Sequence, residues 1–186
     1  EPLAGRIGSR PWHARVALLV IGLLVAWFAE RAMAAVLQER RKDFYEFFCA
    51  AEAMVKGQNP YGVGGTGYIY PPILAALIVP LVPLGLWVAT AVWAGVLIAV
   101  MSLCLWLAAR DSLQRIGGVA PSPVVLAVMA IALVIASDKM RSEIVMGQSN
   151  LLMVLAWVLG LWWLDRRPLL SGVALGFGIN IKYLTV

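Results

Sequence analysis

The amino-acid sequence predicts an all-α protein, a polytopic transmembrane helical bundle, and three observations lead to this fold class. Of 186 residues, 62% are hydrophobic and 13% are charged. The mean hydropathy is +0.86, which is more apolar surface than a soluble core of this length can hide. The apolar residues form blocks near the roughly 20 residues that a helix needs to cross the hydrocarbon layer. The blocks are apolar all round, unlike the alternating strands of a membrane barrel.

Five apolar blocks give the predicted membrane spans, at residues 16–37, 84–109, 119–137, 144–164 and 168–186. We interpret the first as a retained helix rather than a signal peptide, because no small-residue cleavage site follows its apolar core. The chain begins at Glu1 and its last apolar block reaches Val186. We therefore expect a single transmembrane domain, residues 1–186, that belongs to a longer protein.

The charged and sulfur-containing residues add two expectations. The net charge is +5, and the basic residues cluster near the ends of the spans, where anionic headgroups lie. Membrane lipids are therefore expected partners, and a nucleic-acid partner is not expected. Cys49 is predicted in the first loop and Cys104 in a span, so they form neither a metal-ligand pair nor a disulfide. No metal site and no cofactor are predicted.

The loop 39–83 is the longest polar connection and contains two predicted interfacial helices. Residues 43–56 place apolar side chains at helical spacing, and Gly57 supplies a stop. Residues 71–82 would reach only about 18 Å as a helix, too short for a crossing, so we expect an interfacial or re-entrant helix there. With one crossing in 84–109, the segments 39–70 and 138–150 and Lys182 share one membrane face. The distribution of Lys and Arg slightly favours an extracytoplasmic location for that face.

Four polar clusters are left unexplained by membrane insertion alone, and the first two lie in this loop. Asp43 either caps the helix that it begins, since Asp is favoured at helix N-termini, or acts as a general base in a cleft under the loop. Tyr68 and Tyr70 precede a diproline. Aromatic residues belong at the membrane interface in any case, so a role for these tyrosines in binding is an alternative to a structural one.

The other two clusters lie near the ends of predicted spans. Gln148 and Asn150 flank a serine amid apolar sequence, where amides either bond between helices or line a substrate cavity. Lys182 stands in the last apolar block. Its ammonium either snorkels to the interface or binds an anionic lipid phosphate.

The order and spacing of six motifs resemble the N-terminal half of glycosyltransferase family 87, a family of GT-C membrane enzymes. The motifs are Asp43-Phe44-Tyr45, Ala50-Ala51-Glu52-Ala53, Gly57-Gln58-Asn59-Pro60-Tyr61, Tyr68-Ile69-Tyr70-Pro71-Pro72, Gly147-Gln148-Ser149-Asn150 and Gly176-Phe177-Gly178-Ile179-Asn180-Ile181-Lys182. The resemblance covers roughly residues 40–186. Pro often follows the Ile-Lys pair in this family, where this chain has Tyr183.

The resemblance implies an inverting, metal-independent hexosyltransferase with a polyprenyl-phosphate sugar donor, mannose being the expected sugar, and a lipid or glycan acceptor. It implies a bacterial inner-membrane location with the active site on the extracytoplasmic face. Asp43 would be the catalytic base, and Lys182 would hold the departing phosphate. The implied substrate-binding residues besides Lys182 are Arg40, Arg41, Tyr45, Tyr68, Tyr70, Gln148 and Asn150.

Two other classes of function compete with the enzyme. A non-catalytic transmembrane subunit or scaffold of a larger membrane complex would use the same helices to contact membrane-protein partners. A transporter is a weaker alternative, because carriers usually have more intramembrane charge than this chain has.

Overall fold

The computed structural model describes residues 43–115 and 136–182, together with nine separate positions between 12 and 34. Every regular element in these ranges is a helix, and they contain no strand. The predicted spans 16–37 and 119–137 fall largely outside the described residues, as do Arg40 and Arg41. The described part is therefore all-helical, as predicted.

Helix α2, Asp43–Val55, corresponds to the first predicted interfacial helix. Its buried side chains recur at helical spacing and include Phe44, Phe47 and Phe48. Gly57, at φ 67°, ends the helix, and the amide of Gln58 bonds to the carbonyl of Ala53 at 2.8 Å. A glycine in the left-handed conformation is the usual way to terminate a helix in this manner.

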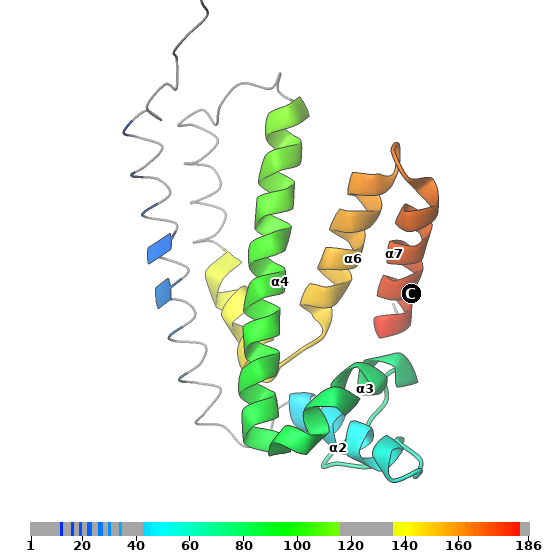
Figure 1. Ribbon diagram of the computed structural model, residues 1–186. Coiled ribbons are helices and arrows are strands. Elements are labelled where there is room, and N and C mark those ends of the chain that lie inside the picture. The colour runs from blue at the N-terminus through cyan, green and yellow to red at the C-terminus, as the bar shows by residue number, and fades with distance from the viewer. Residues whose placement is uncertain are drawn as a thin grey trace, which may run out of the picture.

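The second predicted interfacial segment is divided in two. Helix α3, Pro72–Ile78, is followed by the 3-10 helix η1, Val79–Leu84. Pro80 and Pro83 lack the amide protons that an α-helix would use at these positions, which favours the shorter 3-10 turns. Helix α4 then runs over Gly85–Arg115, 31 residues. It extends beyond the predicted 84–109 and forms the long vertical helix of Figure 1.

The prediction of one continuous helix over 144–164 is wrong. A helix over Ala136–Met146 meets helix α6, Asn150–Trp163, at a bend of 118°. Gly147 has φ 69°, and the amide of Gln148 bonds back to the carbonyl of Glu143 at 2.9 Å. This left-handed glycine ends the first helix. We call residues 147–150 the elbow.

Helices α6 and α7 (Pro168–Ile181) form an antiparallel hairpin, visible at the right of Figure 1. Small residues let their backbones approach closely, as is common between membrane helices. The Ser171 hydroxyl donates to the Gly160 carbonyl at 2.6 Å, and Gly178 lies against the Ala156 side chain. Lys182 follows α7 with an extended backbone.

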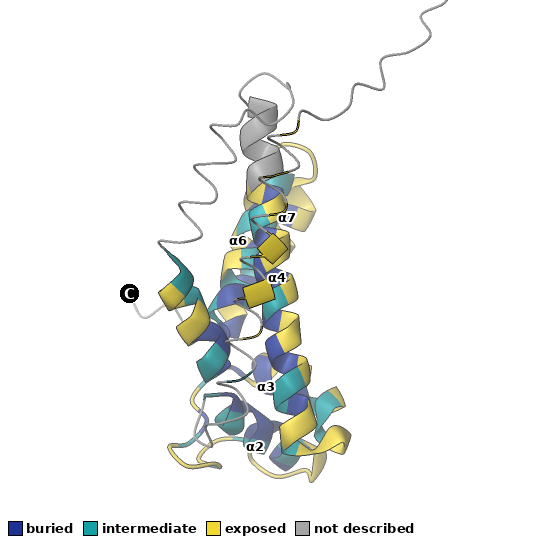
Figure 2. Ribbon diagram, turned by 90° about the vertical axis from the view of Figure 1, so that its left-hand side faces the viewer, coloured by how far each residue is buried: buried dark blue, intermediate teal, exposed yellow. Residues whose placement is uncertain are grey.

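Within the described residues, the segment Pro72–Ala108 contains a helix long and apolar enough to cross a membrane. A second crossing is counted if the two helices joined at the elbow form one broken span. Figure 2 shows exposed residues along the outer faces of the long helices, and many of them are large and apolar. They include Trp87, Val88, Val92, Leu103 and Trp106 on α4, and Leu161, Leu169, Val173 and Ile179 on the hairpin.

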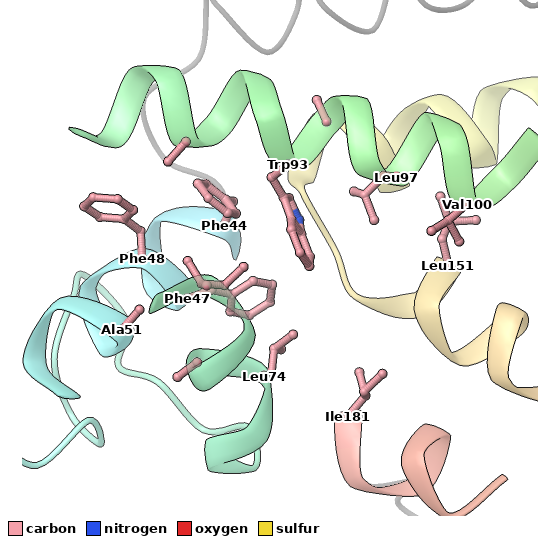
Figure 3. Close-up of a cluster of buried hydrophobic side chains, with 14 of the residues drawn as sticks. Phe44, Phe47, Phe48, Ala51, Leu74, Trp93, Leu97, Val100, Leu151 and Ile181 are labelled. Atoms are coloured by element: carbon pink, nitrogen blue, oxygen red, sulfur yellow. The ribbon is translucent and has the colours of Figure 1, made fainter. Parts of the chain in front are cut away.

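The hydrophobic core joins the two interfacial elements to the long helices. In Figure 1, α2 and α3 lie across the lower end of the structure, below α6 and α7. Phe44 stacks on Trp93 of α4 with ring centroids 5.8 Å apart, as Figure 3 shows. Leu74 of α3 and Ile181 of α7 are fully buried in the same cluster. The core therefore joins residues of α2, α3, α4, α6 and α7 around one region.

Candidate functional site

The hairpin brings together two of the predicted polar clusters. Asn150 begins α6 and Lys182 follows α7, and antiparallel helices of equal length place these two positions at the same end. The Lys182 ammonium donates to Asn150 Oδ1 at 2.9 Å. Residues 32 positions apart are thus joined by a direct hydrogen bond.

Asn150 makes three hydrogen bonds that together define the orientation of its amide. Its Nδ2 donates to Glu143 Oε2 at 2.7 Å and to Gln148 Oε1 at 2.8 Å. Its Oδ1 accepts from Lys182. An amide nitrogen can only donate and its oxygen can only accept, so both Nδ2 protons are used and the oxygen faces the lysine.

Glu143 is a site residue that the sequence analysis missed. It is 6% exposed, and its second oxygen, Oε1, is 2.9 Å from the ammonium of Lys139. We call the connected residues Lys139, Glu143, Asn150 and Lys182 the polar relay. The sequence did contain a signal for Glu143, because it lies four residues after Lys139, the spacing of an ion pair on one helix face. The same spacing also describes an exposed ion pair, so it did not distinguish Glu143 as a site residue.

Tyr70 adds an aromatic wall to the relay. The Lys182 ammonium lies 5.7 Å from the centroid of the Tyr70 ring, within the range of a cation–π interaction. Burial raises the pKa of the Tyr70 phenol, and the charges of Asp43 and Glu143 raise it further. Tyr70 thus lies within electrostatic range of two carboxylates as well as beside the lysine.

Packing of its neighbour Phe44 holds Asp43 near this region. Asp43 is partly buried in the first turn of α2. A Cβ added at Gly147 would come within 2.6 Å of the Phe44 Cβ, so the elbow backbone touches α2. Trp93, which stacks on Phe44, also donates its indole N–H to the Gly147 carbonyl at 2.9 Å. These contacts fix the start of α2 against the elbow.

The structure corrects the expected role of Tyr68. Its side chain is 1% exposed, and its hydroxyl donates to the Pro71 carbonyl and accepts from the Ala75 amide. These bonds tie the loop to the start of α3. Tyr68 is therefore a structural residue, with no face open for stacking on a sugar ring.

Two further loop residues lie apart from the relay. Tyr45 interacts with Cys49 one turn along α2, and this hydrogen bond raises the pKa of the Tyr45 phenol. Glu46 Oε1 accepts from the amides of Gly65 and Thr66 at 3.0 and 2.9 Å. Glu46, also missed by the sequence analysis, thereby anchors the glycine-rich loop that leads to Tyr68 and Tyr70.

The arrangement offers a cation, amide groups and a carboxylate at one end of the helices. Among the described residues, the hydrogen bond of Lys182 goes to a neutral amide rather than to a carboxylate. Its positive charge is therefore available to an anionic ligand such as a phosphate. Both oxygens of Glu143 are already bound, to Lys139 and to Asn150, whereas Asp43 is partly buried in the first turn of α2.

Comparison with protein families shows that the family described as glycosyltransferase family 87 matches residues 68–186. The match includes Tyr70, the elbow, the relay and the hairpin. Comparisons with curated proteins and with solved structures gave no match.

Proposed function

Because the chain belongs to glycosyltransferase family 87, we propose that it transfers a hexose from a polyprenyl-phosphate donor to a lipid or glycan acceptor. The family makes it a membrane glycosyltransferase. Mannose is the sugar that we propose for the donor. The observation that carries the proposal is the Lys182 ammonium, held 2.9 Å from Asn150 and 5.7 Å from the Tyr70 ring centroid, with no carboxylate bonded to it in the described part of the chain.

Lys182 binds the donor phosphate in this proposal. The leaving group gains negative charge as the bond from the anomeric carbon to the phosphate oxygen breaks, and a fixed cation stabilises that charge. The adjacent Tyr70 ring provides an apolar surface for the sugar or for the first isoprene unit. Arg40 and Arg41 are proposed to assist with the phosphate.

Asp43 is the proposed base. Its carboxylate takes the proton from the acceptor hydroxyl, whose oxygen forms a bond to the anomeric carbon as polyprenyl phosphate departs with the bonding electron pair. Attack opposite to the leaving group inverts the anomeric configuration. The contacts of Phe44 with Trp93 and with the elbow support this assignment, because they hold Asp43 on the side of the helices where Lys182 lies.

Gln148 is the better candidate of the two elbow amides for a sugar hydroxyl. Its side chain is partly exposed, and its Oε1 accepts one bond from Asn150, which leaves its NH₂ group to donate. Asn150 uses both of its protons within the relay. We therefore assign Asn150 to holding Lys182.

We also propose a polytopic arrangement in the bacterial inner membrane, with this end of the helices at the extracytoplasmic face. Lipid-linked sugars are presented at a membrane surface, and α2 is a surface helix with apolar residues on one side. The exposed apolar residues of α4 and of the hairpin would contact lipid.

The test is transfer of radiolabelled mannose from polyprenyl-phosphate-mannose by membranes that contain the full-length protein. We expect Asp43→Asn to lower the rate by roughly 10²–10⁴-fold, as for loss of a general base. Lys182→Ala should lower it by roughly 10²–10³-fold, as for loss of a group that stabilises developing charge. Glu52→Gln and Lys56→Ala are matched controls, since these residues form an exposed ion pair.

Full activity of a folded Asp43→Asn protein would refute the assignment of the base. No transfer by the wild-type protein, despite correct folding, would exclude this donor. Retention of a membrane-protein complex by such an inactive protein would favour the alternative, a non-catalytic transmembrane subunit.

A further inference from the structure

We propose that Glu143 is a positioning residue for the donor phosphate: acting through Asn150, it holds the Lys182 ammonium beside the Tyr70 ring. This inference rests on the proposed role of Lys182 as the phosphate ligand. Glu143 does not touch the substrate in this scheme. It determines where the residue that binds the substrate stands.

The side-chain amide of Asn150 links the Glu143 carboxylate to the position of the Lys182 ammonium. The Glu143 carboxylate can only accept, so it selects the orientation in which Nδ2 faces it at 2.7 Å. The same orientation turns Oδ1 toward Lys182, at 2.9 Å. With the amide reversed, Nδ2 would face the ammonium, and two donors would oppose each other.

Lys182 needs such an external support. It follows the last residue of α7 and has an extended backbone, φ −148° and ψ 126°, so no helical turn fixes its long side chain. A flexible lysine loses much side-chain entropy when it is ordered by a ligand. Contacts with Asn150 and with the Tyr70 ring order it beforehand, which preorganises the site.

A second ion pair in the chain shows what is particular to Glu143. Glu52 and Lys56 have the same spacing of four residues and a similar separation, 3.0 Å, but their side chains are 45% and 56% exposed. The Glu143 side chain is 7% exposed and reaches Asn150 as well. Burying a carboxylate costs desolvation free energy that an exposed ion pair does not incur. The hydrogen bond from Asn150 to the Glu143 carboxylate offsets part of that cost.

The experiment measures binding of farnesyl phosphate to the full-length protein in nanodiscs, with farnesol as the uncharged control. We expect Glu143→Met to raise the Kd for farnesyl phosphate about tenfold, the size of one charge-assisted hydrogen bond, and to leave farnesol binding unchanged. Glu143→Gln keeps an acceptor for Asn150 and should restore most of the affinity. Glu52→Gln is the matched control and should bind as the wild type does.

A double-variant cycle separates positioning from a general structural role. If Glu143 acts through Asn150, then Glu143→Met with Asn150→Ala should bind farnesyl phosphate no more weakly than Asn150→Ala alone. Losses that multiply in the double variant would overturn the proposal, as would an equal loss of farnesol binding. Should Glu143→Met not fold, Asn150→Ala carries the test, and wild-type affinity in that variant overturns it.

The Lys182→Ala variant distinguishes this inference from the proposed function. Unchanged farnesyl phosphate binding by Lys182→Ala would remove the proposed phosphate ligand, and the role of Glu143 with it. Weak binding by Lys182→Ala together with normal binding by Glu143→Met would overturn only the role of Glu143.

Discussion

Replacement of Gly147 by alanine tests how closely the elbow is seated against helix α2. Gly147 has φ 69°, a conformation that costs an L-residue roughly 1–2 kcal/mol. The added Cβ would also lie 2.6 Å from the Cβ of Phe44 and 3.5 Å from its Cα. The first of these distances is far inside van der Waals contact, and neither partner atom is the end of a flexible side chain.

The expected cost follows from these two terms. Overpacking in a close-packed region costs roughly 1–3 kcal/mol, in addition to the backbone strain. We therefore expect Gly147→Ala to lower the free energy of unfolding by roughly 2–5 kcal/mol. Relief of the contact requires α2 to move away from the elbow, which displaces Asp43, so transferase activity should fall in the protein that remains folded.

Gly57 provides a matched control for this variant. Its φ is 67°, nearly the same as that of Gly147, but a Cβ there would meet nothing within 4 Å. Gly57→Ala therefore carries the backbone strain without the contact. The assay is the thermal midpoint of the purified protein, followed by tryptophan fluorescence, together with the rate of sugar transfer for each variant.

The difference between the two variants isolates the contact with Phe44. We expect Gly147→Ala to have the lower midpoint, by roughly 2–4 °C for each kcal/mol of additional destabilisation, and Gly57→Ala to keep its activity. Equal midpoints for the two variants would refute the close packing of elbow and helix on which the placement of Asp43 depends.

Three further predictions concern side-chain hydrogen bonds, and thermal unfolding measures each of them. Trp93→Phe keeps an aromatic ring but loses the indole bond to the Gly147 carbonyl and part of a buried side chain, and should cost roughly 1–3 kcal/mol. Ser171→Ala loses the bond to the Gly160 carbonyl at the α6–α7 contact, and should likewise cost about 1 kcal/mol without affecting donor binding. Burial raises the pKa of Tyr68 from 10.0 to about 12. The stability that its neutral hydroxyl confers is therefore complete below pH 10 and is lost as the pH rises through about 12. Tyr68→Phe has no phenol to ionise and should lose less stability over this pH range.

Periodicity and stop residues were enough to locate the elements that depend on local sequence. The predicted helix 43–56 corresponds to α2, Asp43–Val55, because Gly57 is a local signal that needs no tertiary contact. The start of α7 at Pro168 follows from the charged turn before it and from the preference of proline for the first turn of a helix. The ends of the helices between α2 and α7 depend more on contacts with residues distant in the sequence.

The elbow shows where local reasoning failed. Residues 144–164 are apolar enough for a continuous span, and glycine within such a span is common. The bend at Gly147 depends on Phe44 and Trp93, which are distant in sequence and hold the turn by packing and by the bond from the indole. Hydropathy does not register contacts of this kind, so the break was not predicted.

The structure brings several of the residues named from the sequence into contact, and their roles in binding and catalysis are proposals. Tyr70, Gln148, Asn150 and Lys182 are brought together through side-chain contacts. A binding role for Tyr68 followed from the family resemblance, with a structural role left open as the alternative. Tyr68 is buried in the core whereas Tyr70 is only partly buried, and the sequence pattern does not show which of the two tyrosines the core covers.

The neutral Asn150 lies between the carboxylate of Glu143 and the ammonium of Lys182, and this separation leaves the ammonium without a carboxylate partner in the relay. Direct pairing of Glu143 with Lys182 would satisfy both groups, but an incoming phosphate would then have to compete with a carboxylate for the same ammonium. In the relay, Lys139 balances the charge of Glu143 on its other oxygen, and Asn150 conveys only orientation. Among the described residues, Lys182 is therefore held by the dipole of Asn150 rather than by a carboxylate, which leaves its ammonium open to the phosphate that we propose it binds.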